Sequence, residues 1–247
     1  MPITKQLPQG LMEKESFSRK DFVEALKSEY GMTTPQIAYN LKNRLDDGSI
    51  IHSGWDTYVF KGEKLLYNHK YSREAEEVVS TITAEYADVV FQVAELTQLN
   101  TFVNHLIVHN TIFVQVEKAL QDFVFDTLKN AFPGRVMLRP KVDEYYRYRL
   151  DNEIIVSRLP SEAPKGLNAA WQSRLEKILV DVFTDKLMSE IVPNSEKEAI
   201  ITGAFDLYLI DTKTMIRYAK RKGAEKRIEK LLNEYGVMKG DYKRELL

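Results

Sequence analysis

Two stretches of helical apolar spacing, separated by a glycine, lie near the start of the chain. After Ser18, a residue type that caps helix N-termini, apolar side chains recur at helical spacing as far as Gly31. A second period begins at residues 33–35, Thr-Thr-Pro, where a hydroxyl cap and a proline suit the first helical turn. Its apolar face is Ile37, Leu41 and Leu45. The pattern predicts two helices joined by a short turn.

Two short β-like runs follow the second helix. They cover residues 49–52 and 55–60 and are joined through Ser53-Gly54, which is typical of a hairpin. A helix, a turn, a second helix and a hairpin form a helix-turn-helix with a wing, which we predict for residues 1–66. Residues 67–73 are polar and lack a long apolar period, so we interpret them as a linker.

In residues 74–247, short apolar runs alternate with longer helical periods. Strands rich in Val, Ile and Phe are predicted over residues 89–94, 111–116, 135–138 and 153–156. Helices are predicted over residues 72–86, 117–131, 171–191, 197–209, 213–222 and 224–235. We therefore expect an α+β protein, in which an N-terminal winged helix-turn-helix precedes a mixed α/β domain with an all-helical C-terminal end.

Composition excludes several classes of protein. The chain has 247 residues, of which 44% are hydrophobic and 29% charged, so it is neither disordered nor fibrous. It has no cysteine, which removes disulfides, iron–sulfur clusters and thiol nucleophiles and is typical of a reducing compartment. With no apolar leader and no long apolar run, we expect a cytoplasmic protein without a membrane segment.

The total charge of −1 hides an uneven distribution. Residues 1–71 sum to +1, residues 72–212 to −8 and residues 213–247 to +6. A basic C-terminal helical face of this kind favours contact with phosphates or with an acidic partner. Its candidate partner-binding residues are Arg217, Lys220, Arg221, Lys222, Lys226 and Arg227.

The second N-terminal helix carries side chains of the types that read DNA. Asn and Gln can pair with adenine, Arg with guanine and Lys with phosphate, while threonines at a helix N-terminus suit a phosphate oxygen. The candidates are Thr33, Thr34, Gln36, Tyr39, Asn40, Lys42, Asn43 and Arg44, with His52 and Trp55 on the wing. A homodimer would double these contacts. The alternatives are an ordinary solvated helix face or a winged helix that docks proteins.

An enzyme is the competing class. The common signatures for dinucleotides, P-loop nucleotides, zinc peptidases and α/β hydrolases are all missing from the sequence. Asp88, Glu117 and Lys118 suggest a metal-dependent nuclease, although Val116 stands where such sites carry an acid two residues before the lysine. His105 and His109 have metal-ligand spacing but read better as a turn entering a strand. We assign no catalytic residue, metal or cofactor.

A second group of carboxylates, Glu176, Asp181 and Asp185, lies in the predicted helix over residues 171–191. Glu176 and Lys177 fall near the edge of its apolar face, and Asp181 lies partly toward that face. We expect them to form a solvated helix edge, with a docking surface as the alternative.

Two parts of the chain resemble a known family. The segments that carry the likeness are GSII at 48–51 with GWDTYV at 54–59, and LEKILVDV at 175–182 with residues 206–209 and IRYAKRK at 216–222. Together they span about half of the chain. They resemble the AbiEi type of antitoxin from abortive-infection toxin–antitoxin systems, and the wider group of transcriptional regulators of phage-defence operons.

The resemblance implies a DNA-binding regulator that is not an enzyme. Its N-terminal domain would bind double-stranded operator DNA and repress its own promoter through Thr34, Gln36, Asn40, Asn43, Arg44 and the wing around residues 52–55. Its C-terminal domain would counteract a co-expressed nucleotidyltransferase-like toxin through the basic helices over residues 217–227. The alternative remains a nuclease or nucleotidyltransferase-like enzyme delivered by the winged helix.

Overall fold

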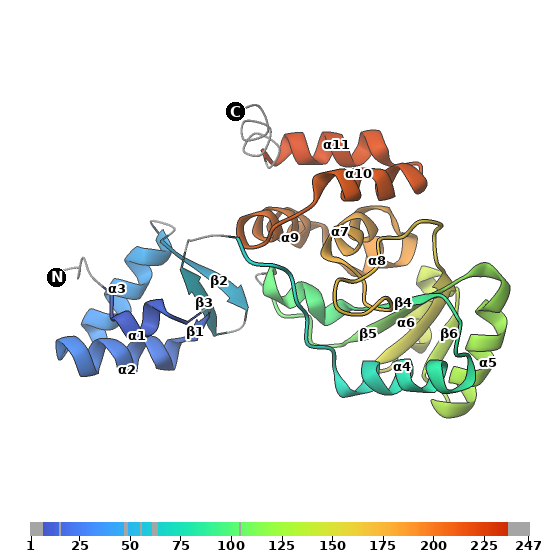
Figure 1. Cartoon of the computed structure of the whole chain (residues 1–247), viewed down its shortest axis with the longest axis horizontal. Coiled ribbons are helices and arrows are strands. Elements are labelled where there is room, and N and C mark those ends of the chain that lie inside the picture. The colour runs from blue at the N-terminus through green and yellow to red at the C-terminus, as the bar shows by residue number, and fades with distance from the viewer. Residues whose placement is uncertain are drawn as a thin grey trace. The chain divides into compact units, whose positions relative to one another are not determined.

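The chain divides into two compact units, Met1–Leu65 and Leu66–Leu247. The structure, a computed structural model, describes residues 7–14, 16–46, 49–54, 56–60, 64–103 and 105–236 (Figure 1). Each unit has its own hydrophobic core.

The first unit contains both predicted helices and the predicted pair of strands. Its elements are α1 (Gln9–Met12), β1 (Phe17–Ser18), α2 (Arg19–Tyr30), α3 (Thr34–Asp46), β2 (Ile50–Gly54) and β3 (Thr57–Phe60). The strands form an antiparallel sheet in the order β1-β3-β2, with a register shift between His52 and Gly54. Neither α1 nor β1 was expected, because both are too short to show a period.

Local hydrogen bonds fix where the two helices begin and end. Ser18 Oγ accepts the N–H of Asp21 at 3.1 Å, and the Asp21 carboxylate accepts the N–H of Ser18 at 2.8 Å, so α2 starts with a capping box. Gly31 ends α2 at φ 62°, a left-handed conformation that favours glycine. Its N–H bonds to the carbonyl of Lys27 at 3.0 Å. The chain can therefore turn sharply into α3.

The core of the first unit joins all of these elements. It is formed by the buried residues Leu11, Phe17, Phe22, Leu26, Ile37, Leu41, Ile50 and Tyr58. The ring of Phe17 lies 5.8 Å from those of Phe22 and Tyr58, and 4.7 Å from that of Phe60. Because Phe17 is on β1, this short strand connects the sheet to α2.

The second unit is built on a four-stranded mixed sheet in the order β4-β5-β7-β6. The strands are β4 (Phe91–Glu95), β5 (Thr111–Val116), β6 (Val136–Leu138) and β7 (Glu153–Arg158). β4 runs antiparallel to β5, whereas β5, β7 and β6 are parallel. Two helices, α4 (Arg73–Glu85) and α5 (Gln121–Ala131), cover one face of this sheet and bury a core of Val, Ile, Leu and aromatic side chains (Figure 1).

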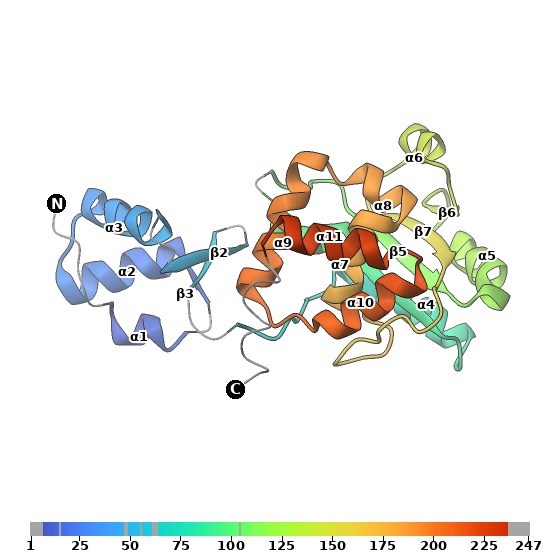
Figure 2. The same cartoon turned by 90° about the horizontal axis from the view of Figure 1, so that it is seen from above.

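Helices from the C-terminal part of the chain lie on the other side of the sheet (Figures 1 and 2). They are α7 (Leu175–Thr184), α8 (Lys186–Ile191), α9 (Asn194–Leu207), α10 (Thr212–Arg221) and α11 (Glu225–Glu234). The single helix predicted over residues 171–191 was wrong, because Asp185 has an extended backbone and caps α8 by accepting the N–H groups of Leu187 and Met188. The all-helical end and the mixed α+β class are confirmed.

Three further elements were not predicted in their observed form. They are the 3₁₀ helix η1 (Leu96–Thr101), the 3₁₀ turn η2 (Lys118–Leu120) that precedes α5, and α6 (Val142–Tyr148). All three are shorter than two full turns of apolar repeat, so periodicity does not detect them. Across the described ranges, none of the helices is long and apolar enough to span a lipid bilayer.

The capping box gives the first testable prediction. Replacing Ser18→Ala removes the acceptor for the N–H of Asp21 and should cost the first unit about 1 kcal/mol. Hydrogen exchange of α2 amides in the full chain should then be roughly fivefold faster. The control is Ser28→Ala, which removes an exposed hydroxyl that only bonds to the carbonyl of Ala25. Equal exchange rates in the two variants would show that the box does not stabilise α2.

Candidate functional site

The outward surface of α3 is the first candidate interface. The side chains of Thr34, Tyr39 and Lys42 are exposed, with Tyr39 at 40%. Tyr39 and Lys42 are three residues apart, so they lie on the same side of the helix. This surface offers a hydroxyl near the helix N-terminus, an aromatic ring with a polar tip and one positive charge. Such groups can contact phosphates and base edges.

Asn40 was expected on this surface, and the structure corrects that prediction. The side chain is 0% exposed, and its Nδ2 donates to the carbonyl of Gln36 at 2.9 Å and lies 3.9 Å from Met32 Sδ. An asparagine amide can pair with the backbone one turn earlier as readily as with a base. Asn40 therefore belongs to the interior of the unit.

Gln36 and Thr33 are also engaged locally. Gln36 Oε1 accepts both the N–H and the hydroxyl of Thr33, each at 2.9 Å. This pairing is typical of a helix start, because the first turn of a helix leaves N–H groups without intrahelical partners. Both residues stabilise the N-terminus of α3 as the structure stands, and they would have to release each other before contacting DNA.

The remaining DNA-binding candidates are placed only in part. Asn43 and Arg44 are half-buried, and the carbonyl of Arg44 accepts the hydroxyl of Ser49 at 3.3 Å. The side chain of His52 and the whole of Trp55 lie outside the described residues, so their roles on the wing stay predictions.

The basic C-terminal face is present on α10 and α11, which lie side by side (Figure 2). Five of the six candidate residues are exposed: Arg217, Lys220, Arg221, Lys226 and Arg227. Met215, Tyr218 and Ala219 lie on the buried side of α10. Arg221 is exposed but already forms a salt bridge with Glu162.

Lys222 does not belong to that face, which corrects its assignment as a partner-binding residue. Its Nζ lies 2.6 Å from Asp181 Oδ1, and its side chain is 13% exposed. Lys177 Nζ lies 2.8 Å from Oδ2 of the same carboxylate, and the Tyr218 hydroxyl donates to Oδ1 at 3.0 Å. One carboxylate thus joins α7 to α10.

The prediction that this edge of α7 is exposed to solvent is therefore wrong. Glu176, Lys177 and Asp181 are all buried, with 4%, 1% and 1% exposed. Helices α8, α9 and α10 all pack against α7, so its polar edge is covered. Glu176 is satisfied there by the guanidinium of Arg174 and by the N–H of Asp211, each at 3.0 Å.

The Asp181 cluster makes stability depend on pH. Burial by itself would raise the pKa of Asp181, but the charges of Lys177 and Lys222 outweigh it and hold the pKa below its ordinary value. A carboxyl with a lowered folded-state pKa stabilises the fold fully above its unfolded pKa. That contribution is lost as the pH falls through the folded value. The contribution of the Asp181 carboxylate is therefore lost in acid.

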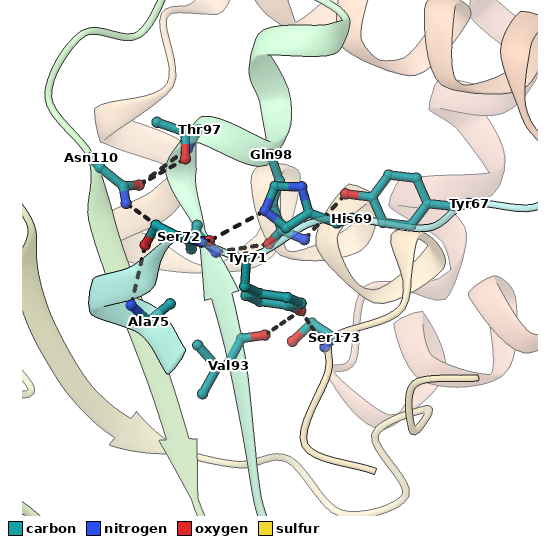
Figure 3. Close-up of polar contacts among 11 residues, drawn as sticks. Tyr67, His69, Tyr71, Ser72, Ala75, Val93, Thr97, Gln98, Asn110 and Ser173 are labelled. Atoms are coloured by element: carbon teal, nitrogen blue, oxygen red, sulfur yellow. Dashed lines mark hydrogen bonds and ion pairs between the residues drawn. The ribbon is translucent and has the colours of Figure 1, made fainter. Parts of the chain in front are cut away.

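A second buried carboxylate, that of Glu95, binds the segment with which the second unit begins; the network around it is drawn in Figure 3. The side chain of Glu95 is 0% exposed. Its Oε2 accepts the N–H of Ser72 at 2.9 Å and lies 3.2 Å from His69 Nε2, while Oε1 accepts from Asn110 Nδ2 at 2.8 Å. Burial would raise the pKa of Glu95, yet these hydrogen bonds together leave it lowered.

Tyrosines from the same segment extend this network. The Tyr71 hydroxyl donates to the carbonyl of Val93 at 3.0 Å and accepts the N–H of Ser173 at 3.2 Å (Figure 3). The hydroxyl of Tyr67 accepts from Gln98 Nε2 at 3.1 Å. Residues 67–73, interpreted as a linker, are therefore packed into the second unit. The alternation of Tyr67, His69 and Tyr71 was the sequence signal that could have shown this.

The His69–Glu95 pair resembles an acid–base dyad in geometry. The cavity beside it has a volume of about 60 Å³ and is lined by Tyr67, Ser173 and Arg174 among others. That is room for a few water molecules. The arrangement suits a network that fixes the segment to the sheet better than a substrate site.

The side chains considered for a nuclease site, Asp88, Glu117 and Lys118, do not form a metal-binding group. Asp88 and Lys118 are exposed, whereas Glu117 is half-buried at the end of β5, where its N–H bonds to the carbonyl of Val90 at 3.1 Å. His105 pairs with Glu196 at 2.8 Å, and His109 lies 3.9 Å from Asp151. In the part of the chain that the structure describes, no group of three or more His, Asp or Glu side chains could hold a metal ion.

The sequence matches the model of a protein family. The model of a family of unknown function, DUF6577, matches residues 36–237, more than three quarters of the chain. No curated protein matches the sequence. The matched region begins within α3 and includes the whole sheet and the helices α4 to α11.

The Asp181 cluster gives the second prediction. Replacing Asp181→Asn leaves two lysine side chains inside without their counter-charge, which should lower the free energy of unfolding by about 3 kcal/mol or more. Urea unfolding of the full chain, followed by circular dichroism, measures this loss. The matched control is Asp206→Asn on the exposed side of α9, expected to stay within about 0.5 kcal/mol. Similar losses in the two variants would contradict a stabilising role for the cluster.

Proposed function

The chain belongs to the DUF6577 family, and we propose that it is a DNA-binding transcriptional regulator, not an enzyme, whose first unit acts as a winged helix. The observation that carries the proposal is the order and pairing of the elements in that unit. A tight left-handed turn at Gly31 joins α2 to α3, and a two-stranded hairpin follows α3 at once. In DNA-binding proteins of this type, the second helix enters the major groove.

The proposed contact surface is smaller than the sequence suggested. It consists of Thr34, Tyr39 and Lys42 on the exposed side of α3, supplemented by Asn43 and Arg44 near its end. The N-terminus of α3 adds the positive end of a helix dipole, which attracts phosphate. With so few cations in one copy, we propose that two copies bind together on a duplex with twofold symmetry.

The resemblance to AbiEi-type antitoxins extends the proposal to the second unit. We propose that the basic face of α10 and α11 binds an acidic surface on a co-expressed, nucleotidyltransferase-like toxin and counteracts it. Support comes from the exposed, same-sign side chains Arg217, Lys220, Lys226 and Arg227. A field of one sign on a rigid helical pair steers an oppositely charged partner.

The DNA-binding role gives the third prediction. With the duplex from immediately upstream of its own gene, Lys42→Ala should weaken binding and lower the slope of log K against log salt by about 1, because one phosphate contact is lost. Tyr39→Ala should weaken binding without changing that slope. Fluorescence anisotropy of labelled DNA at several salt concentrations measures both quantities.

The control for this titration is Lys118→Ala, which removes the same charge from the exposed η2 turn of the second unit. It should leave both affinity and slope unchanged. If the unaltered protein binds no DNA, or if Lys42→Ala and Lys118→Ala behave alike, α3 does not read DNA.

The partner surface gives the fourth prediction. The double variant Arg217→Glu, Lys226→Glu reverses two charges on this face. It should weaken binding to the protein encoded by the adjacent gene by at least about tenfold. Isothermal titration calorimetry with the two purified proteins measures the change in affinity. The control is Lys118→Glu, which reverses a charge outside the basic face. If the adjacent gene product does not bind, or binds the double variant equally well, the basic face is not the antitoxin surface.

A further inference from the structure

Three exposed leucines surround the small cavity beside His69. Leu66, Leu167 and Leu209 are 69%, 62% and 55% exposed, and all three line that cavity. They are three of the five exposed leucines in the part of the chain that the structure describes. We call these three residues the leucine patch. Exposed apolar side chains that gather around a polar depression are typical of surfaces that bind other proteins.

The turn that carries Leu167 is fixed against the segment that carries Leu66. Asn168 Nδ2 donates to Asn68 Oδ1 at 3.0 Å across this contact. The backbone of the turn is closely packed, because a Cβ at Gly166 would collide with neighbouring backbone and side-chain atoms. The backbone positions of the two leucines are therefore set before a partner binds, which lowers the entropy cost of binding.

A pair of tyrosine rings connects the third leucine to the first. Tyr67 directly follows Leu66, and Tyr208 directly precedes Leu209. The two rings meet edge to face, with their centroids 5.1 Å apart. Because these rings pack against each other, the leucines next to them lie on neighbouring parts of the surface. The leucine patch is therefore one continuous feature of the second unit.

The leucine patch carries no charge that would repel a copy of itself. Among the described residues, the lining side chains that can be charged near neutral pH are His69, Arg174 and Glu176. Glu176 accepts two hydrogen bonds from the Arg174 guanidinium, each at 3.0 Å, and His69 lies 3.2 Å from the Glu95 carboxylate. Such a surface favours neither a phosphate nor an acidic or basic partner. In a twofold contact a surface meets itself, so like charges would oppose each other there and a neutral surface does not.

We infer that the leucine patch is the surface through which two copies of this chain pair around a twofold axis. In such a contact, each patch covers the leucines of the other. Leu66 directly follows the last residue of the first unit, Leu65. Pairing at the leucine patch therefore brings the points at which the two first units are attached close together.

This position of the junction suits a reader of symmetric DNA. Two first units attached near one axis can reach half-sites that lie one helical turn of DNA, about 34 Å, apart. That step rests on the proposed DNA binding, whereas the pairing itself does not, because every residue of the leucine patch belongs to the second unit.

Sedimentation velocity of the full chain without DNA tests the pairing. The unaltered chain should be a dimer at micromolar concentration. Leu167→Glu and Leu209→Glu should each raise the dimer dissociation constant by at least about tenfold, because a buried carboxylate then replaces an apolar contact in both copies. The matched control is Phe123→Glu on α5, where an apolar side chain outside the leucine patch is 60% exposed. It should dimerise like the unaltered chain, and all three exposed positions should tolerate the change without unfolding.

A second measurement uses the absence of cysteine from the chain. Leu66→Cys places a single thiol near the proposed twofold axis, so mild oxidation should join two copies by a disulfide. Phe123→Cys should stay monomeric on a non-reducing gel.

The outcomes separate the pairing from DNA binding. An unaltered chain that is monomeric, or a dimer that the leucine substitutions weaken no more than Phe123→Glu does, would overturn the inference, even if the chain binds DNA. A dimer that both leucine substitutions weaken, but that binds no DNA, supports the leucine patch and contradicts only the proposed DNA binding.

Discussion

The carboxylate of Asp181 holds two lysines and a tyrosine inside the helical layer of the second unit. Each of its oxygens bonds to an ammonium group, and the Tyr218 hydroxyl adds a third contact. Both ammonium groups also lie about 6 Å from the centre of the Tyr218 ring. Since a buried charge is tolerated only when it is paired and hydrogen-bonded, the packing of α7 on α10 depends on this cluster.

The same requirement, that buried polar groups find partners, decides which residues remain available for function. Asn40 and Gln36 form hydrogen bonds with backbone and side-chain groups at the start of α3. Only a few side chains of this helix therefore remain available to contact DNA. Lys222 satisfies Asp181, so the basic C-terminal face loses one of its cations.

Much of the fold was accessible from the sequence. The strand predicted over residues 111–116 has the bounds observed for β5, because a short run of β-branched and aromatic residues is fully buried there. Helix starts at Ser18 and at residues 33–35 were readable from their capping residues. By contrast, α6 and η1 are too short to show a period. The break at Asp185 depends on side-chain capping that a continuous apolar period conceals.

The candidate sites were less predictable, because exposure depends on tertiary packing. Lys177 and Asp181 are four residues apart, a spacing that predicts an exposed helix pair as well as a buried one. Only the packing of α10 against α7 decides between them. Similarly, nothing local distinguishes Asn40, which is buried, from Asn43, which is half-buried on the same helix. The leucine patch depends on a contact between Asn68 and Asn168, 100 residues apart, and no spacing in the sequence indicates it.

We propose that α3 is the DNA-reading element of this chain. The decisive measurement is hydrogen–deuterium exchange of the full chain, with and without the duplex from upstream of its own gene. DNA binding should slow exchange in peptides that contain Thr34–Asp46 and leave exchange in the strands β4 to β7 little changed. Unchanged exchange in α3, with DNA bound and protection only in the second unit, would contradict it.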